Sequence, residues 1–579
     1  MRAPGCRRAP HAALSATCLA IAIGCAGVAP RAAGGNAGSA QPAGGSGGGS
    51  TGGSGGRQAR GSGGAPDAGG STADAGPPIP PLTDLPADPI IDTGAPPDSP
   101  TLFSTPGRNS GAPCILSPET GTLMPRNWLR PRFSYTPAAD ENLFEITLAV
   151  TGFAHQLVIY TPARAYTLDP ALWASLRTSV NDQPVGVTVR ALTLSGSGTV
   201  QNPPSAAATA DFTVAPVDAP GKIVYWAIPN GSSDGILRGF GIGEEGVEDV
   251  LVASQLLAPT ITASQNDGCI GCHAATPDGL SVGFQLGPHN NSGPDSYYDS
   301  VADISGATVG QMPSWATPAQ LAALRGLRGI PAFSRSHWTD GDHVVLVMDG
   351  KNQGQLLWLN LDTDGAQGTL ARAGDSAGAT EPSFSHDGTQ IVYASATSLV
   401  DGRLANGPAD LYTVPYGARA GGAAGKLPGA SDPAYTEYYP AFSPDDAYVA
   451  FTRFAGNGNS YSNNQAEVFV VSSVGGQALR FGANDPPACQ TGARSPGVTN
   501  DWPKWSPEQT AASNGTTYYW VTFSSTRDGR PQLYVAPMTV KAGVVEVGYP
   551  ALYLWNQPAS DDNHTPSWDD YQIPSINIG

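Results

Sequence analysis

The chain has 579 residues, which is enough for several domains of about 100–200 residues each. It contains 73 Gly and 53 Pro, and only 13% of its residues are charged, which excludes a coiled coil or a long helical array. The formal net charge of −18 argues against a nucleic-acid partner, because phosphate binding requires a basic surface.

The first 24 residues predict an export signal. Three arginines give it a positive start, and the apolar run from Ala12 to Gly24 is too short to cross a bilayer. A small residue stands directly before Cys25, and this arrangement resembles the lipobox of bacterial lipoproteins. The resemblance implies that Cys25 is lipidated and anchors an exported protein, periplasmic or on the cell surface, to the outer membrane. Ordinary signal cleavage without a lipid is the alternative.

Residues 25–102 are predicted to form a disordered tether. The stretch from Gly34 to Gly76 holds 18 Gly, and no aromatic residue precedes Phe103, so no core is expected there. Gly/Ser-rich chain is flexible, and the Pro-rich stretch from Pro77 to Pro100 is stiffer. A lipid anchor followed by such a leash would hold a folded body away from a membrane surface.

Residues 103–216 are predicted to form a β-sandwich. Apolar residues alternate with polar or small ones in Phe144–Val150 and in Val185–Val189, which is the period of half-buried strands. A short helix is expected near Pro170–Leu176. The segment PETGTLMPRNWLRPRFSY resembles the opening of immunoglobulin- and fibronectin-like modules of bacterial surface proteins, which implies a sandwich of that kind.

Residues 217–579 contain a repeat. An acidic turn residue recurs, and apolar residues stand four and six positions after it, as in Asp387, Ile391 and Tyr393. A tight turn followed by such a pair indicates a β-hairpin. Repeats begin near residues 273, 331, 382, 440, 503 and 566, which predicts a six-bladed β-propeller. The sixth repeat lacks later strands, so residues 222–252 are expected to complete it and close the ring.

The segments SFSHDGTQIVYAS, AFSPDDAYVAFTR and FSSTRDGRPQLY are similar to repeats of TolB-like periplasmic β-propellers. The resemblance implies an extracytoplasmic propeller with a face for a protein partner. TolB carries an α/β domain before its propeller, where this chain has a β module, so a role in the Tol system does not follow. The predicted fold class is all-β: an immunoglobulin/fibronectin-like β-sandwich followed by a six-bladed β-propeller.

Cys269, Cys272 and His273 form a Cys-x-x-Cys-His motif. This spacing lets two thiols add across the vinyl groups of a haem while the adjacent imidazole ligates the iron. The motif resembles the attachment site of c-type cytochromes, which implies covalently bound haem c with His273 as the proximal ligand. His273 occupies the position of Pro382 and Pro440 in later repeats, so the haem is expected at the start of a blade.

Two other interpretations of the motif stay open. Cys269 and Cys272 can form a disulfide or a redox pair, although a thioredoxin-like motif is typical of a βαβ setting. Another metal is also an option, although a structural zinc site needs four ligands and a second ligand pair at short spacing is missing.

Cys114, Cys489 and His564 are further candidates for a structural or ligating role. Cys114 and Cys489 are allowed to form a disulfide in an exported protein, if their Cα atoms come within reach. His564 is the candidate for the distal ligand of the haem iron, since it lies two residues before Pro566 in the blade that closes the ring. His337, near the start of the second blade, is expected to be packed instead. A cap on a surface turn is the alternative role for His564.

The metalloprotease motif His-Glu-x-x-His is missing from residues 103–579. An enzyme of the common hydrolase or metalloprotease classes is not expected. The sequence predicts an exported, membrane-tethered propeller with haem c, working with a redox partner in electron transfer or in haem-based sensing. The alternatives are a non-catalytic TolB-like scaffold for a protein partner without haem, and a haem enzyme such as a peroxidase with an open sixth position.

Overall fold

The structure is a computed structural model, and it describes residues 81–579 except 233, 262–267, 289–297, 328, 350–353, 401–402, 405–406 and 574–579. The predicted signal, Cys25 and most of the predicted tether therefore lie outside the described residues. Nearly all regular structure in the described part is β-strand, which confirms the predicted fold class. Within that part, no helix has both the length and the apolar character that crossing a bilayer requires.

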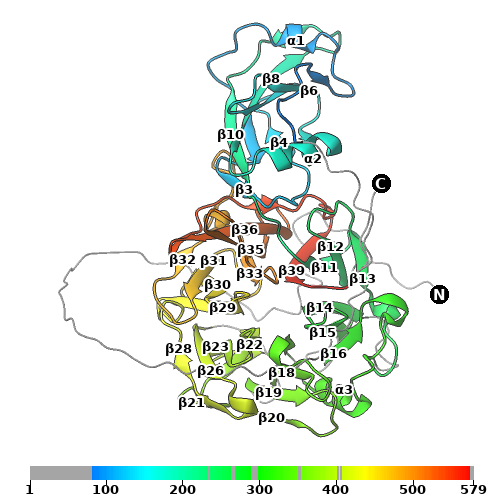
Figure 1. Cartoon of the computed structure of the whole chain (residues 1–579), viewed down its shortest axis with the longest axis vertical. Coiled ribbons are helices and arrows are strands. Elements are labelled where there is room, and N and C mark those ends of the chain that lie inside the picture. Colours follow the sequence, from blue (N-terminus) through cyan, green and yellow to red (C-terminus); the bar gives the residue numbers. More distant parts are fainter. Residues whose placement is uncertain are drawn as a thin grey trace, which may run out of the picture. The chain divides into compact units, whose positions relative to one another are not determined.

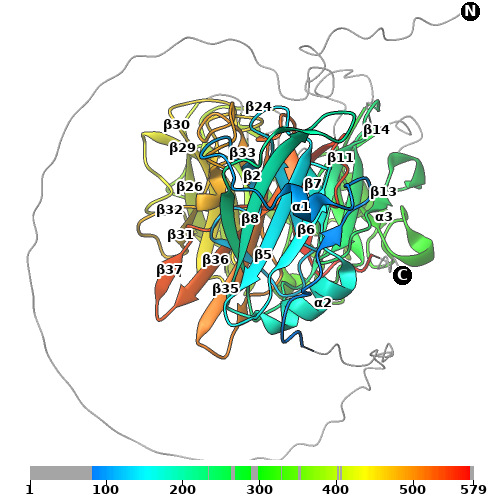
Figure 2. The same cartoon turned by 90° about the horizontal axis from the view of Figure 1, so that it is seen from above.

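The first folded module is a sandwich of two sheets. One sheet has the order β1-β6-β5-β8-β10-β3 with β9 beside β8, and the other has the order β2-β4-β7. The two sheets share one apolar core, in which the rings of Tyr135 and Phe144 lie 4.7 Å apart. Figure 2 shows β5, β6 and β8 side by side. The strands are β1 (Ile90–Ile91), β2 (Cys114–Ser117), β3 (Thr122–Met124), β4 (Arg132–Thr136), β5 (Leu143–Val150), β6 (Leu157–Thr161), β7 (Ala165–Thr167), β8 (Pro184–Leu194), β9 (Val200–Asn202) and β10 (Ala208–Val214).

A helix of ten residues, α2 (Pro170–Ser179), covers part of this core at the place where the sequence predicts one. The carboxylate of Asp169 caps it by accepting hydrogen bonds from the first free backbone N–H groups, and Pro170 stands at the first helical position. Trp173 and Leu176 are the buried residues on its inner face. The kinship of the module with immunoglobulin-like domains stays a prediction.

The module begins earlier than the sequence suggested. Leu85 is 3% exposed and belongs to the module core, and β1 pairs in parallel with β6. A short helix, α1 (Ser99–Leu102), follows. The predicted tether boundary at residue 102 is therefore wrong. The segment before it is Pro-rich, but a few of its apolar residues pack against the neighbouring sheet.

Besides two two-stranded sheets, β21 (Ala371–Ala373) with β27 (Gly421–Ala423) and β24 (Leu399–Val400) with β25 (Arg403–Leu404), six sheets of three or more strands follow along the chain. Figure 1 shows these six arranged around a ring in chain order. Each begins with a strand on the inside of the ring, and the sheets are separated by apolar clusters. The sheets are β14 (Gly268–Ala275), β15 (Ser281–Pro288) and β16 (Tyr298–Asp303); β17 (Ala332–Phe333), β18 (Val344–Asp349), β19 (Gln355–Asn360) and β20 (Gln367–Thr369); β22 (Gly378–Phe384), β23 (Gln390–Ala396), β26 (Ala409–Pro415) and β28 (Gly425–Lys426); β29 (Tyr435–Phe442), β30 (Tyr448–Ala455), β31 (Glu467–Ser472) and β32 (Leu479–Arg480); β33 (Asn500–Trp505), β35 (Thr516–Ser525), β36 (Gln532–Lys541) and β37 (Val544–Glu546), with β34 (Thr510–Ala511) and β38 (Leu552–Tyr553) at its margins; and β39 (Asp562–Asp569) with β11 (Lys222–Ile228), β12 (Ile236–Gly241) and β13 (Glu248–Leu251).

The last sheet joins the two ends of the propeller. Strand β39 pairs antiparallel with β11, with Trp568 opposite Ile223 and His564 opposite Trp226. In Figure 1 the red β39 lies beside the green β11 and β12. The inner strands β14, β17, β22, β29, β33 and β39 contact one another in that order, and β39 contacts β14 again. The predicted closure by residues 222–252 is confirmed, because β39 pairs with β11 and makes β11 an interior strand of its sheet.

The recurring acidic residues are turn-formers, as the repeat frame indicates. Asp278, Asp387 and Asp445 each accept a hydrogen bond of 2.6 to 2.7 Å from the Ser or Thr hydroxyl two residues earlier. In two of these turns the next residue is a glycine with positive φ, at Gly279 and Gly388, a conformation that costs other residues energy. These carboxylates therefore serve local structure.

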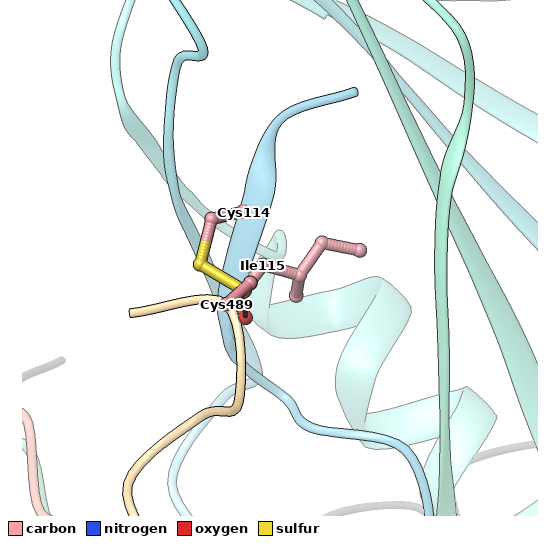
Figure 3. The surroundings of a disulfide bond; sticks show 3 residues. All are labelled: Cys114, Ile115 and Cys489. Atoms are coloured by element: carbon pink, nitrogen blue, oxygen red, sulfur yellow. Dashed lines mark hydrogen bonds between the residues drawn. A yellow bond between two sulfur atoms is a disulfide. The ribbon is translucent and has the colours of Figure 1, made fainter. Parts of the chain in front are cut away.

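The module is bonded to the propeller. Cys114 at the start of β2 and Cys489 in the loop before β33 form a disulfide with a Cα–Cα distance of 5.4 Å, drawn in Figure 3. Cys489 Sγ also lies 3.6 Å from the carbonyl oxygen of Ile115, a van der Waals contact because a disulfide sulfur has no hydrogen to donate. Arg130 of the module also forms an ion pair with Glu245, and its carbonyl oxygen accepts a hydrogen bond from the Trp555 indole.

Candidate functional site

The inner strands share an irregularity just before the proline that marks each repeat. In β22, β29 and β33 the pairing with the next strand slips by one residue there, and β14 and β39 show the same slip. Four residues directly before the prolines adopt positive φ although none is glycine: Glu381, Tyr439, Trp502 and Thr565. Such bulges re-aim side chains and are common beside functional sites. We call the residues one and two positions before each repeat proline, on the inner strands, the inner wall of the ring.

The Cys-x-x-Cys-His motif forms β14, the inner strand of the first blade. Cys269 is 7% exposed and Cys272 is 9% exposed, and neither is in a disulfide among the described residues. The Cys269 sulfur accepts a hydrogen bond from the backbone N–H of Gly235 at 3.2 Å. Cys269 belongs to the same apolar cluster as Trp226, whereas Cys272 belongs to a different cluster with Tyr439 and Trp502. The two thiols therefore have separate surroundings.

His273 is buried, with 6% of its surface exposed. Its Nε2 lies 3.1 Å from the carbonyl oxygen of Val224, and its Nδ1 lies 3.3 Å from that of Gly271. Burial lowers the pKa of His273 to about 4, so the ring is neutral near pH 7. Because a neutral imidazole has one N–H and a carbonyl oxygen can only accept, only one of the two contacts is a hydrogen bond.

His564 lies in β39 and is 4% exposed. Its Nε2 is 3.7 Å from Oδ1 of Asp501, and its Nδ1 has no hydrogen-bond partner among the described residues. Its ring is surrounded by Tyr461, Trp226 and Trp502, with centroid distances of 5.2, 6.2 and 6.4 Å. Burial lowers the pKa of His564 to about 3. The alternative role of His564 as a cap on a surface turn is wrong, because His564 lies in a buried inner strand.

Asp501 occupies the same repeat position in β33 as His564 does in β39. It is 0% exposed, and neither carboxylate oxygen has a hydrogen-bond partner in the described part of the chain. Burial alone raises its pKa well above the usual range of a carboxyl group. Lys504, three residues along β33, has its pKa lowered by burial, which the charges of Glu381 and of a Cys272 thiolate oppose. Polar and charged groups thus gather on the inner wall.

The structure brings some of the sequence-predicted residues together and separates others. The motif and His564 lie on inner strands that contact each other, and Trp226 joins their surroundings, since it packs with Cys269 and faces His564. His337 is packed against Tyr416 at 4.6 Å and its Nδ1 lies 3.2 Å from Asp342, as expected of a structural residue. Asp501, Tyr438, Trp502 and Thr565 were missed. The signal that could have found them is their shared place, one or two residues before the repeat proline.

The donor types in β14 fit haem c, but their placement does not. The motif supplies two cysteines directly followed by a histidine, in a chain whose Cys114 and Cys489 form a disulfide. However, the thiols belong to separate clusters, and both nitrogens of His273 face backbone carbonyl oxygens. Attachment of a haem would require Cys269–His273 to leave their place beside β15. Among the residues that the structure describes, no group of three His, Cys, Asp or Glu is arranged to hold a metal ion.

Comparison with known proteins gives similarity of fold alone. No protein-family model and no curated protein matches the chain. A solved structure from Agrobacterium tumefaciens described as a TolB is similar over 59% of this chain and 97% of its own, with 15% identity and a TM-score of 0.30. Hydrazine synthase from Kuenenia stuttgartiensis is similar over 51% of this chain and 74% of its own, with 15% identity and a TM-score of 0.27. An endo-arabinase from Bacteroides thetaiotaomicron is similar over 42% and 83%, with 10% identity and a TM-score of 0.26.

Proposed function

We propose that this chain is an exported β-propeller that carries one covalent haem c at Cys269 and Cys272 and works with a redox partner in electron transfer or haem-based sensing. The observation that supports it is the Cys269-x-x-Cys272-His273 motif, which stands in a chain whose Cys114 and Cys489 form a disulfide. Disulfides of the first kind form in oxidising compartments, which agrees with export.

The haem would place a redox group at the inner wall of the ring. His273 is the proposed proximal ligand, and its Nε2 would exchange the Val224 carbonyl for iron. His564 is the proposed distal ligand, since it is held on the neighbouring inner strand with Nδ1 unpartnered among the described residues. The surrounding Trp and Tyr rings would exclude water from this space.

Expression with the native signal in a bacterium that matures c-type cytochromes tests the proposal. The exported protein should stain for haem after denaturing electrophoresis, and its mass should exceed that of the polypeptide by one haem. A Cys269→Ala/Cys272→Ala variant should lose both signals. The matched control is Cys114→Ser/Cys489→Ser, which removes the same number of cysteines and should keep the haem. Native protein without haem under these conditions would refute the proposal.

Absorption spectra of the same preparation test the two histidines. With His564 on iron, the protein should be six-coordinate and low-spin, and His564→Ala should turn it into a five-coordinate, high-spin form. An unchanged spectrum would remove His564 from the coordination sphere. A high-spin spectrum of the unmodified protein would favour a haem enzyme with an open sixth position.

Membrane attachment through Cys25 belongs to the same proposal. Cys25→Ser should move the exported protein from the membrane fraction to the soluble fraction, because a serine at position 25 cannot carry the acyl chains of the proposed anchor. Labelling with a radioactive fatty acid should disappear in the same variant. Membrane association that survives the change would contradict the lipid anchor.

A second candidate function is an interaction scaffold without haem. The observation that favours it is the burial of β14: His273 is hydrogen-bonded to the backbone, and both cysteines are packed in apolar clusters. In that case the propeller face would bind a protein partner, and the motif residues would only form part of the inner strand β14 of the first blade. A haem-free native protein whose Cys269→Ala/Cys272→Ala variant loses thermal stability would support the scaffold.

A further inference from the structure

An open cleft lies on the outer part of the sixth blade, where β13 is the outermost strand of the sheet (Figure 1). Its volume is about 460 Å³, within the range of about 300–1,000 Å³ that is typical of sites for small ligands. The residues that line it are Arg238 of β12, Val247, Glu248 and Asp249 at the start of β13, and Pro558 in the loop before β39. None of them takes part in the haem proposal, so a ligand of this cleft would be independent of the haem.

The carboxylates of the cleft already hold one guanidinium group. Arg238 donates from Nε to Oδ1 of Asp249 at 2.8 Å and from Nη1 to Oδ2 of Asp561 at 2.5 Å. The Arg238 side chain is 17% exposed and that of Asp561 is 7% exposed, so this end of the cleft is largely shielded from water. Interactions between charges are stronger where water is excluded. The inner end of the cleft is therefore suited to a charged ligand.

The cleft keeps an excess of negative charge. Arg238 is a single cation beside the three carboxylates of Glu248, Asp249 and Asp561. In the described part of the chain, Glu248 has no ion pair and no side-chain hydrogen bond, and the second oxygen of Asp249 accepts no hydrogen bond. The Asp249 side chain is 56% exposed, so a ligand can reach that oxygen. The open acceptors of the cleft therefore favour a cation that carries hydrogen-bond donors.

A buried hydroxyl group lies on the inner side of the same charged groups. Tyr225 of β11 stands opposite Arg238 in the sheet, so the two side chains lie on one face. Tyr225 is 0% exposed, its Oη has no hydrogen-bond partner among the described residues, and the charges of Arg238, Asp561 and Asp249 act on it. A buried polar group without a partner costs about 1–3 kcal/mol. A polar group that enters the inner end of the cleft would reduce this cost.

The remaining lining residues, Val247 and Pro558, are apolar. Long basic side chains combine a charged end with an apolar stem, and they bury the stem against such surface. A guanidinium group suits the cleft better than an ammonium group, because its planar fork can donate two parallel hydrogen bonds to one carboxylate. A metal ion suits it less, since no group of three His, Cys, Asp or Glu in the described part of the chain is arranged to hold one.

We propose that the cleft between β13 and the loop before β39 binds the guanidinium group of an arginine side chain, with Glu248 and the second oxygen of Asp249 as its acceptors. Val247 and Pro558 contact the stem of that side chain. The group can come from a free arginine derivative or from an arginine within a peptide partner, and the affinities of the two distinguish these sources.

Ligand-observed NMR titration of the exported full-length protein at low ionic strength tests the cleft. The probe is N-acetyl-arginine amide, and the control is N-acetyl-citrulline amide, which has nearly the same shape and no charge. Saturable binding of the arginine probe is expected, with weaker binding as salt is added and none of the citrulline control. Glu248→Gln should weaken binding at least about threefold. Glu508→Gln, which removes an exposed carboxylate between β33 and β34, is the matched control and should leave the affinity unchanged.

The double variant Glu248→Gln/Asp249→Asn should abolish binding, because Arg238 then balances the one carboxylate that remains, Asp561. Its melting temperature should stay close to that of the native protein, since an exposed ion pair contributes only about 0–1 kcal/mol. Equal binding of the arginine and citrulline probes, or an unchanged affinity in both Glu248 variants, would overturn the proposal.

A peptide of one arginine flanked by glycines identifies the source of the guanidinium group. Tighter binding of the peptide than of N-acetyl-arginine amide would assign the cleft to a peptide partner, and equal binding would assign it to the arginine side chain alone; both results support the site. Binding that persists in Cys269→Ala/Cys272→Ala, or in protein without haem, would keep this site while the haem proposal fails.

Discussion

The disulfide between Cys114 and Cys489 is expected to make a large contribution to stability. It joins residues 375 positions apart, and it links the sandwich module to the loop before β33. In the chain-entropy model, closing a loop of that length lowers the entropy of the unfolded chain by an amount worth about 6 kcal/mol at 25 °C. Native disulfides usually deliver about 2–5 kcal/mol, so we expect a loss in that range when both cysteines are changed.

The variant for this test is Cys114→Ser/Cys489→Ser. It should still fold, because the Arg130–Glu245 ion pair, the Trp555 hydrogen bond and a shared apolar cluster also join module and propeller. Differential scanning calorimetry should show its first transition lowered by at least about 4 °C, taking roughly 2 °C per kcal/mol. A reductant should lower the temperature of the same transition in the native protein by a similar amount, and it should leave the transition temperature of the variant unchanged. An equal melting temperature for variant and native protein would refute the reasoning.

Two further predictions concern ring closure and pH. Trp568 in β39 is 4% exposed and donates a hydrogen bond to the Pro220 carbonyl at 2.8 Å, so Trp568→Ala should cost about 3–5 kcal/mol in urea denaturation. A loss below 1 kcal/mol would mean that closure is not required for stability. Burial raises the pKa of Glu119 to about 7, above its unfolded value, so its contribution is present at pH 4.5 and is lost as pH rises through 7. Glu119→Gln should therefore raise the melting temperature relative to the native protein at pH 8 and change it little at pH 5; the reverse order would contradict this.

Sequence patterns predicted the propeller because each blade repeats the same turn followed by the same pattern of buried strand residues. The Ser/Thr-x-Asp turn and the apolar pair after it recur, and each recurrence was visible without coordinates. Closure by residues 222–252 followed from counting strands. The start of the module was missed because residues 81–102 are Pro-rich like the chain before them, and only a few features, among them Leu85, β1 and α1, distinguish the two stretches.

The inner wall was harder to predict than the blades. His564 was singled out by its repeat position, but its polar neighbours resembled a turn, since the pattern for strands assumes an apolar face. Asp501 and Trp502 belong to no motif, and their importance arises from burial without partners, which only a three-dimensional structure shows. Sequence reasoning therefore found the frame and one of the side chains, and the structure supplied the rest.

The backbone of the same wall is strained, and this yields a last prediction. Thr565 has φ of 42°, which is unfavourable for a β-branched residue and costs about 1–3 kcal/mol. Glycine adopts this conformation freely, although it costs about 0.5–1 kcal/mol through the unfolded chain. Thr565→Gly should therefore leave the free energy of unfolding unchanged or raise it by up to about 2 kcal/mol, as measured by urea denaturation. Thr522→Gly in β35 is the control. The φ of Thr522 is not positive, and its hydroxyl donates to the Tyr534 carbonyl, so this change should destabilise the protein. Equal losses in both variants would show that Thr565 is not strained. In this conformation the backbone N–H of Thr565 donates to Ser524 Oγ at 3.1 Å, while the Thr565 hydroxyl has no partner among the described residues, so the strain is tied to the bulge of β39 and not to a contact of the side chain.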